Sequence, residues 1–150
     1  MSAGWIIPFI ILGGALQTCG AAMNGQLNKY VVNPWLASAM SFALITLFFV
    51  GASLIHPYPL PSQKELSEMP WWAVIGGLVG AVQVYAGLTL VNKVGAGLFT
   101  GLTVTAALIA SLVVDHFGWF RMQPHPVNLG RVIGGILLVA GVTLVAKFGN

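Results

Sequence analysis

Five long apolar runs alternate with short polar or proline-rich segments along this chain of 150 residues. Each run holds about twenty residues, which is enough for a helix rising 1.5 Å per residue to cross the hydrocarbon core of a bilayer. The pattern predicts membrane spans at about 4–24, 35–55, 71–91, 95–117 and 129–148. We therefore expect an all-α integral membrane protein with a single transmembrane domain over residues 1–150.

The segments between the runs predict where each helix begins and ends. The polar stretch Asn24–Asn33 reads as an extension of the first helix into the interface, and Pro34 begins the second helix. Three prolines in the following HPYPLP segment forbid helix. Ser62, with Glu65 three residues later, predicts a capping box for one short turn. The start of the chain lacks the basic region of a cleaved signal, so we expect it to remain as the first span.

Polar residues follow one face of the span at 95–117. Thr100, Thr103, Ser111 and Asp115 recur at helical spacing, with Ala107 between them. Lipid cannot solvate such a stripe, so it must meet protein or water, and the three hydroxyl residues become candidates for lining a substrate cavity. The other interpretation is that each hydroxyl bonds to a carbonyl of its own helix. The sequence leaves both open.

Two other spans share a pattern in which glutamine is flanked by glycines. The first span carries Gln17 and Asn24 on its glycine face, and the third span carries Gln83 on a matching face. Polar residues inside a membrane are costly, which makes these three candidates for lining a substrate site; hydrogen bonds between packed helices are the alternative. Tyr85, together with Trp35, is a candidate for stacking on a planar or cationic ligand.

Asp115 is the one acidic residue that falls within a predicted span. It lies near the C-terminal end of its helix, where a negative charge opposes the helix dipole and calls for a partner. His116, Arg121 or a second subunit could supply that partner. Asp115 can be an interfacial anchor, a group for proton or ion coupling, or a substrate contact, and the sequence does not choose between them.

The last span carries Gly130, Gly134 and Gly141 along one face. Small residues at this spacing allow close approach of another helix. We expect this face to form an interface between subunits.

Composition excludes several classes of function. The chain is 57% hydrophobic and 6% charged with a mean hydropathy of +0.90, and its net charge is only +3, which does not indicate nucleic-acid binding. Its one cysteine and scattered histidines predict neither a disulfide nor a metal site. We find no paired carboxylates, nucleophile elbow or phosphate-binding loop, so we expect no enzyme activity and no cofactor.

Basic residues are divided evenly between the two sides of the membrane that five spans imply. One side carries Lys29, Lys93 and Lys147, and the other carries Lys64, Arg121 and Arg131. Positive charge fixes orientation only by an excess on the cytoplasmic side, and neither side has one. We therefore predict that the chain inserts both ways and forms an antiparallel homodimer, a ten-helix inverted repeat. A partner protein that dictates the orientation is the alternative.

Three runs resemble a known family: PWWAVIGGLVGA (70–81), TLVNKVGAGLFTGL (89–102) and SLVVDHFGWF (111–120). They are similar to the five-helix, half-size YdcZ-like family of the drug/metabolite transporter superfamily, which is related to the small multidrug-resistance exporters. The resemblance implies a bacterial inner-membrane protein. Two departures matter: Gln17 and Asn24 occur where the small exporters have a glutamate in the first helix, and Ala107 replaces a glutamine of the five-helix family.

Together these observations predict a transporter subunit that moves a small, neutral or weakly charged metabolite or drug-like compound by alternating access as a dimer. Its expected partners are a second copy or a paralogous half-transporter, the lipid bilayer and the substrate. The alternative function is a non-transporting structural or regulatory subunit that assembles with another membrane protein. A passive pore is a third hypothesis.

Overall fold

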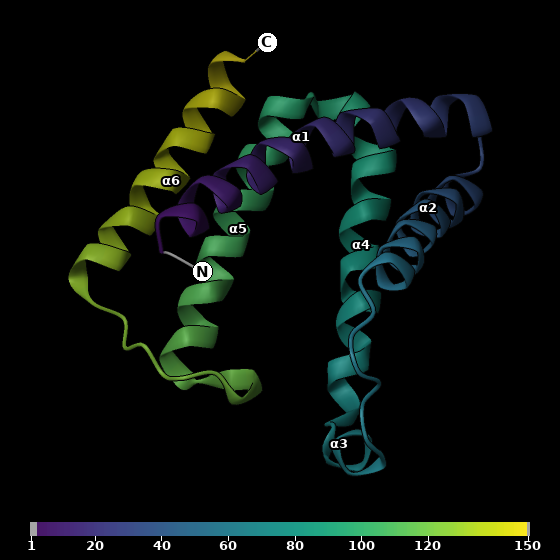
Figure 1. Ribbon diagram of the computed structural model, residues 1–150. Helices are drawn as coiled ribbons and strands as arrows, with labels where there is room; N and C mark the ends of the chain where they lie inside the picture. The colour runs from purple at the N-terminus through teal and green to yellow at the C-terminus, as the bar shows by residue number, and fades with distance from the viewer. Residues whose placement is uncertain (1–2, 150) are drawn as a thin grey trace. The chain divides into compact units, whose positions relative to one another are not determined.

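The computed structural model describes residues 3–149, and every regular element in that range is a helix (Figure 1). The chain divides into two compact units, Met1–Lys93 and Val94–Asn150. The first contains η1 (Ala3–Trp5), α1 (Ile6–Val31), α2 (Pro34–Ile55), α3 (Gln63–Glu68) and α4 (Trp71–Val94). The second contains α5 (Ala96–Phe117), η2 (Trp119–Arg121) and α6 (Leu129–Phe148).

Helices α1 and α2 pack against each other and are joined by a two-residue turn. Val32 takes a left-handed conformation with φ of 62°, and its N–H donates to the Asn28 carbonyl oxygen at 2.9 Å. The Asn33 side chain then accepts from the N–H groups of Trp35 and Leu36, which caps α2. Pro34 occupies the first helical position, where its missing N–H costs nothing.

The short helix α3 begins with the capping box that the sequence predicts. The Glu65 N–H donates to Ser62 Oγ at 3.3 Å, and the Ser62 N–H donates to Glu65 Oε2 at 2.7 Å. Hydrogen bonds from Ser62 lower the pKa of the Glu65 carboxyl below its ordinary value; the bond from the Ser62 backbone N–H has the larger effect and the bond from its hydroxyl the smaller.

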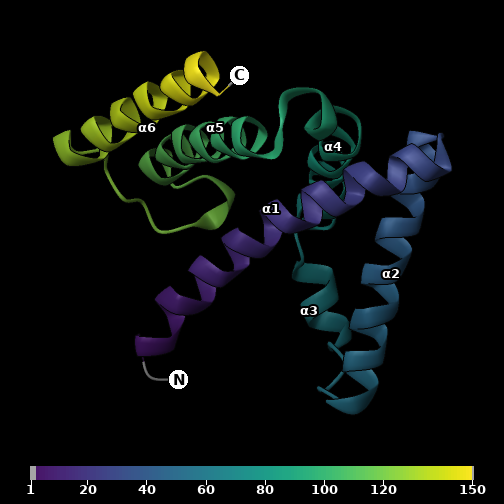
Figure 2. The same ribbon diagram turned by 90° about the horizontal axis from the view of Figure 1, so that it is seen from above.

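In the second unit, α5 and α6 run side by side in opposite directions, as both views show (Figures 1 and 2). Gly118, with φ of 61°, ends α5, and the Asn128 side chain caps α6 by accepting from the Arg131 N–H at 3.0 Å. Gly101 allows close packing, because a Cβ there would lie 2.8 Å from Val142 Cγ2.

The prediction of an all-helical fold with five spans is confirmed: α1, α2, α4, α5 and α6 are each long and apolar enough to cross a membrane. Helices α2, α5 and α6 begin and end within one residue of the ranges expected from the sequence, whereas α1 begins at Ile6 and continues to Val31, and α4 continues to Val94. Part of the polar stretch 24–33 is therefore helical and continues α1. Most large apolar side chains are exposed in the described chain, because the solvent for a membrane span is hydrocarbon.

Candidate functional site

Two asparagines link α1 to α4, and each donates a hydrogen bond to a backbone carbonyl of the opposite helix. Asn28 Nδ2 donates to the Leu88 carbonyl oxygen at 3.1 Å, and Asn92 Nδ2 donates to the Gly25 carbonyl oxygen at 2.7 Å. Each asparagine thus comes from one helix and binds the other, so the pair is reciprocal. We call these four residues the carboxamide clasp.

Gly25 makes this approach possible because it has no side chain. A Cβ at position 25 would overlap Val91 Cγ1 and would lie 2.8 Å from Asn92 Nδ2. Leu88 is only 1% exposed and Val91 3% exposed, so the clasp lies in a closely packed part of the first unit. The glycine is required here by packing.

The clasp leaves one buried acceptor without a partner. Asn28 Oδ1 is buried and makes no hydrogen bond within the part of the chain that the structure describes. The orientation of this amide follows from its neighbour, because the Leu88 carbonyl can only accept and must therefore face the NH₂ group. An unsatisfied buried acceptor costs about 1–3 kcal/mol, so Asn28 Oδ1 is a position where an added hydrogen-bond donor would be stabilising.

A second polar contact and an aromatic pair extend this cluster toward α2. Ser41 Oγ donates to Asn24 Oδ1 at 3.2 Å. The Trp35 and Tyr85 rings stack with centroids 4.7 Å apart and planes tilted by 32°. In this conformation the two aromatic residues proposed as ligand contacts contact each other, and they join α2 to α4.

Of the lining residues predicted in the first unit, Asn24 and Tyr85 lie in this cluster, whereas the side chains of Gln17 and Gln83 are exposed. Sequence reasoning missed Asn28, Asn92 and Ser41. The available signal was Asn28, one turn after Asn24 and three residues after Gly25, inside a stretch that was interpreted only as interfacial.

The predicted polar stripe on α5 is satisfied largely by α5 itself. Thr103 Oγ1 donates to the Thr100 carbonyl oxygen at 3.0 Å, and Ser111 Oγ donates to the Leu108 carbonyl oxygen at 2.7 Å. For Thr103 and Ser111, the interpretation that the hydroxyls bond to their own helix is therefore confirmed. Their role in a cavity stays a prediction.

Asp115 has its partner on α6. Arg131 Nη1 lies 3.2 Å from Asp115 Oδ2 and 3.3 Å from the His125 carbonyl oxygen, and the His125 N–H donates to the Asp115 carbonyl oxygen at 2.8 Å. The antiparallel pairing of α5 and α6 puts the last turn of one beside the first turn of the other. His116, one of the partners considered from the sequence, instead accepts from the Val127 N–H at 3.3 Å.

The glycine face of α6 is open in the described chain. Nothing lies within 4 Å of a Cβ built at Gly134 or Gly141, and at Gly130 the nearest atom is Asn128 Oδ1 at 3.4 Å. Gly135, one residue on and about 100° around the helix, is buried and faces Leu112 of α5. The face that we predict for subunit association is thus distinct from the face that packs on α5.

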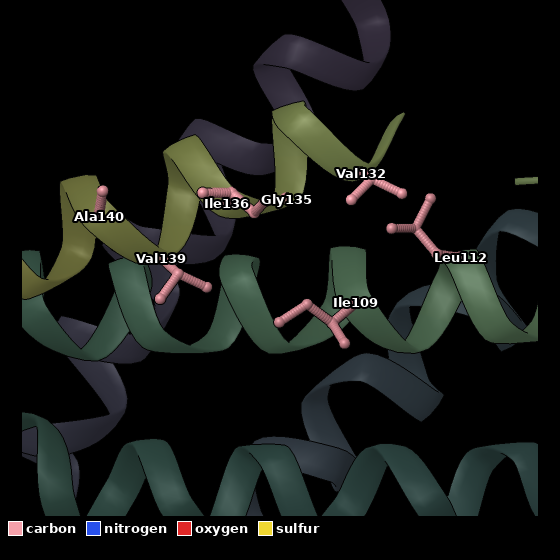
Figure 3. Close-up of a pocket in the computed structure, with 7 residues that line it drawn as sticks. All are labelled: Ile109, Leu112, Val132, Gly135, Ile136, Val139 and Ala140. Atoms are coloured by element: carbon pink, nitrogen blue, oxygen red, sulfur yellow. The ribbon is translucent and has the colours of Figure 1, made fainter. Parts of the chain in front are cut away.

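An apolar groove of about 420 Å³ runs between α5 and α6 (Figure 3). Ile109 and Leu112 of α5 line it on one side, and α6 contributes the rest of the lining: Val132, Gly135, Ile136, Val139 and Ala140. A smaller hollow of about 200 Å³ shares Leu112 and is lined in part by His116. Within residues 3–149, no group of three or more histidine, cysteine or acidic side chains is placed to hold a metal ion.

Five helices that are each long and apolar enough to cross a membrane define a multi-pass integral membrane protein. Residues 5–144 match the family described as "Putative inner membrane exporter, YdcZ", so the chain belongs to this family, and the resemblance seen in the sequence is confirmed. The chain is also similar to "Inner membrane protein YdcZ" of Escherichia coli (strain K12), with 36% identity over 86 residues.

That alignment covers 55% of this chain and 54% of the relative, so the chain spans about half the length of the curated protein that it matches. No solved structure matches the chain. Membership of this family, with five candidate spans, places the protein in the inner membrane as a multi-pass protein.

Proposed function

We propose that this chain is one subunit of a dimeric transporter that moves a small, neutral or weakly charged metabolite or drug-like compound by alternating access. The observation that carries the proposal is the neutral polar cluster of the first unit, where Asn28 Oδ1 is a buried acceptor that lacks a donor. Polar groups inside a membrane are costly and tend to mark substrate pathways.

The charge distribution supports a neutral substrate. In α1, α2 and α4 the only charged side chains are Lys29 and Lys93, and both lie in the last turn of their helix. A cationic substrate bound among these helices would have no counter-ion and would carry a desolvation penalty of several kcal/mol, and an anionic substrate would meet positive charge only at the helix ends. Amide and hydroxyl groups instead suit a ligand that both donates and accepts hydrogen bonds.

The lining residues that we propose are those indicated by the sequence. Asn24 and Tyr85 already belong to the polar cluster, while the exposed Gln17 and Gln83 are available to a site completed by a second copy. Thr100, Thr103 and Ser111 remain candidates on α5. For Asp115 we retain a role in proton or ion coupling as a hypothesis.

The proposal can be tested with purified protein and a panel of small metabolites. Compounds that raise the thermal midpoint in detergent would then be assayed for uptake into proteoliposomes. We expect the active compounds to be neutral, and we expect Gln17→Ala and Asn24→Ala to reduce uptake while Gln63→Ala, an amide change in α3 outside the spans, leaves it unchanged. Full uptake in both Gln17→Ala and Asn24→Ala would contradict the model.

We infer that the active form is an antiparallel homodimer. The even division of lysine and arginine supports insertion in both orientations, and the open Gly134 and Gly141 face supports helix association. The test is to replace Cys19 with alanine, add one cysteine after Asn150 and label intact cells with an impermeant thiol reagent. Labelling of about half the molecules supports dual insertion; labelling of all or none indicates a single orientation and a paralogous partner.

A further inference from the structure

The groove between α5 and α6 has the properties of a site for an acyl chain. Its lining is entirely apolar, its volume is about 420 Å³, and a second hollow of about 200 Å³ shares Leu112 with it. Gly135 contributes no side chain to the lining, and Ile109 and Val139 are 45% and 43% exposed (Figure 3). In a bilayer, such an open apolar channel is filled by hydrocarbon.

Charged groups lie at one end of this groove. Arg131 is four residues before Gly135 on the same face of α6, and Asp115 is three residues after Leu112 on the same face of α5. The ion pair between them therefore lies one helical turn beyond Gly135 and Leu112. His116, four residues after Leu112, lines the second hollow at this same end.

Both partners of the ion pair have hydrogen-bonding groups that the pair itself does not use. Arg131 uses only Nη1, for Asp115 Oδ2 and the His125 carbonyl oxygen, so its Nη2 and Nε donors have no partner among residues 3–149. Asp115 Oδ1 likewise has no partner in that range. Both side chains are partly exposed, at 36% and 25%. The end of the groove therefore offers a cationic donor and an anionic acceptor side by side.

We propose that this groove binds one phospholipid with a zwitterionic headgroup that carries a primary ammonium. The acyl chain lies in the groove, the phosphate accepts hydrogen bonds from Arg131, and the ammonium donates to Asp115 Oδ1. A headgroup with only negative charge would satisfy Arg131 but would leave Asp115 Oδ1 without a donor. A trimethylammonium headgroup has the right charges but no N–H to donate.

The test is lipid retention measured by native mass spectrometry. The full-length protein is exchanged into micelles that contain equal amounts of phosphatidylethanolamine, phosphatidylcholine and phosphatidylglycerol with identical acyl chains. One charge-assisted hydrogen bond at a partly exposed site predicts a preference of about three- to tenfold for phosphatidylethanolamine over phosphatidylcholine. Equal retention of the three lipids, or a preference for phosphatidylglycerol, overturns the proposal.

Two variants separate the headgroup from the acyl chain. Asp115→Asn keeps an oxygen for Arg131 and removes the carboxylate charge, so it should abolish the preference between the two zwitterionic lipids. Ala140→Leu adds bulk inside the groove and should lower retention of all three, whereas Ala146→Leu, the same change on α6 outside the groove, should not. An unchanged preference in Asp115→Asn, or equal retention in both leucine variants, also overturns the proposal.

Discussion

Replacing Gly25 by alanine tests the carboxamide clasp most directly. The added Cβ would overlap Val91 Cγ1 and would lie 2.8 Å from Asn92 Nδ2. Because Asn92 Nδ2 is the donor to the Gly25 carbonyl at 2.7 Å, the substitution should separate α1 from α4 and weaken that hydrogen bond. The matched control is Gly20→Ala on the same helix, where nothing lies within 4 Å of the new Cβ.

The expected magnitude follows from three contributions. Alanine favours a helix over glycine by about 0.5–1 kcal/mol, and this gain is common to both variants. Overpacking at Gly25 should cost about 1–3 kcal/mol. A hydrogen bond between membrane helices contributes about 0.6 kcal/mol on average. Gly25→Ala should therefore be less stable than Gly20→Ala by about 1.5–3.5 kcal/mol.

The assay is unfolding of the purified protein by SDS titration from mixed micelles, followed by circular dichroism. Gly20→Ala should unfold at the same SDS fraction as the wild type or at a higher one, and Gly25→Ala at a lower one. Adding Val91→Ala to Gly25→Ala should recover part of the loss, since it removes the contacted methyl group. Equal stability of the two glycine variants would refute the proposed packing of α1 on α4.

Three further predictions concern local features. Carboxyl NMR should show a Glu65 pKa below its ordinary value, and Ser62→Ala should raise that pKa. Because the pKa is lowered in the folded state, the cap stabilises α3 fully at pH values above the unfolded-state pKa. This stabilisation is lost as the pH falls through the lower folded-state pKa. Gly118→Ala should destabilise the protein by about 1–2 kcal/mol in the same SDS titration, since φ is 61° at this residue. Tyr85→Leu should cost about 0.5–1.5 kcal/mol through loss of the stack on Trp35, and an unchanged midpoint would exclude a contribution from that contact.

The features predicted correctly from the sequence are those set by local physical chemistry. Span lengths follow from runs of apolar residues, the start of α2 follows from Pro34, and the first turn of α3 follows from Ser62 and Glu65. Each depends on groups within a few residues of one another. A bilayer strengthens this rule, because every span must satisfy its backbone internally and so becomes a helix.

The contacts that the sequence did not predict depend on the register between helices. Asn28 and Asn92 reach carbonyls 60 and 67 residues away, so their role requires knowing that α1 meets α4. Likewise, the sequence left His116, Arg121 or a second subunit as possible partners of Asp115, but the antiparallel register of α5 and α6 provides Arg131 instead. Polar residue type alone marks such positions as important without identifying their partners.

The contrast between hydroxyl and carboxamide side chains indicates which polar residues should be sensitive to substrate. A serine or threonine hydroxyl reaches a carbonyl of its own helix, as Thr103 and Ser111 do, and so can face lipid at little cost. The clasp asparagines instead bond to another helix, and Asn28 retains a buried acceptor without a donor. Moving α1 relative to α4 must break these bonds, whereas it leaves the α5 hydroxyl bonds intact. If the transport cycle moves these helices, we expect substrate binding to alter the hydrogen bonds of the clasp asparagines more than those of Thr103 and Ser111.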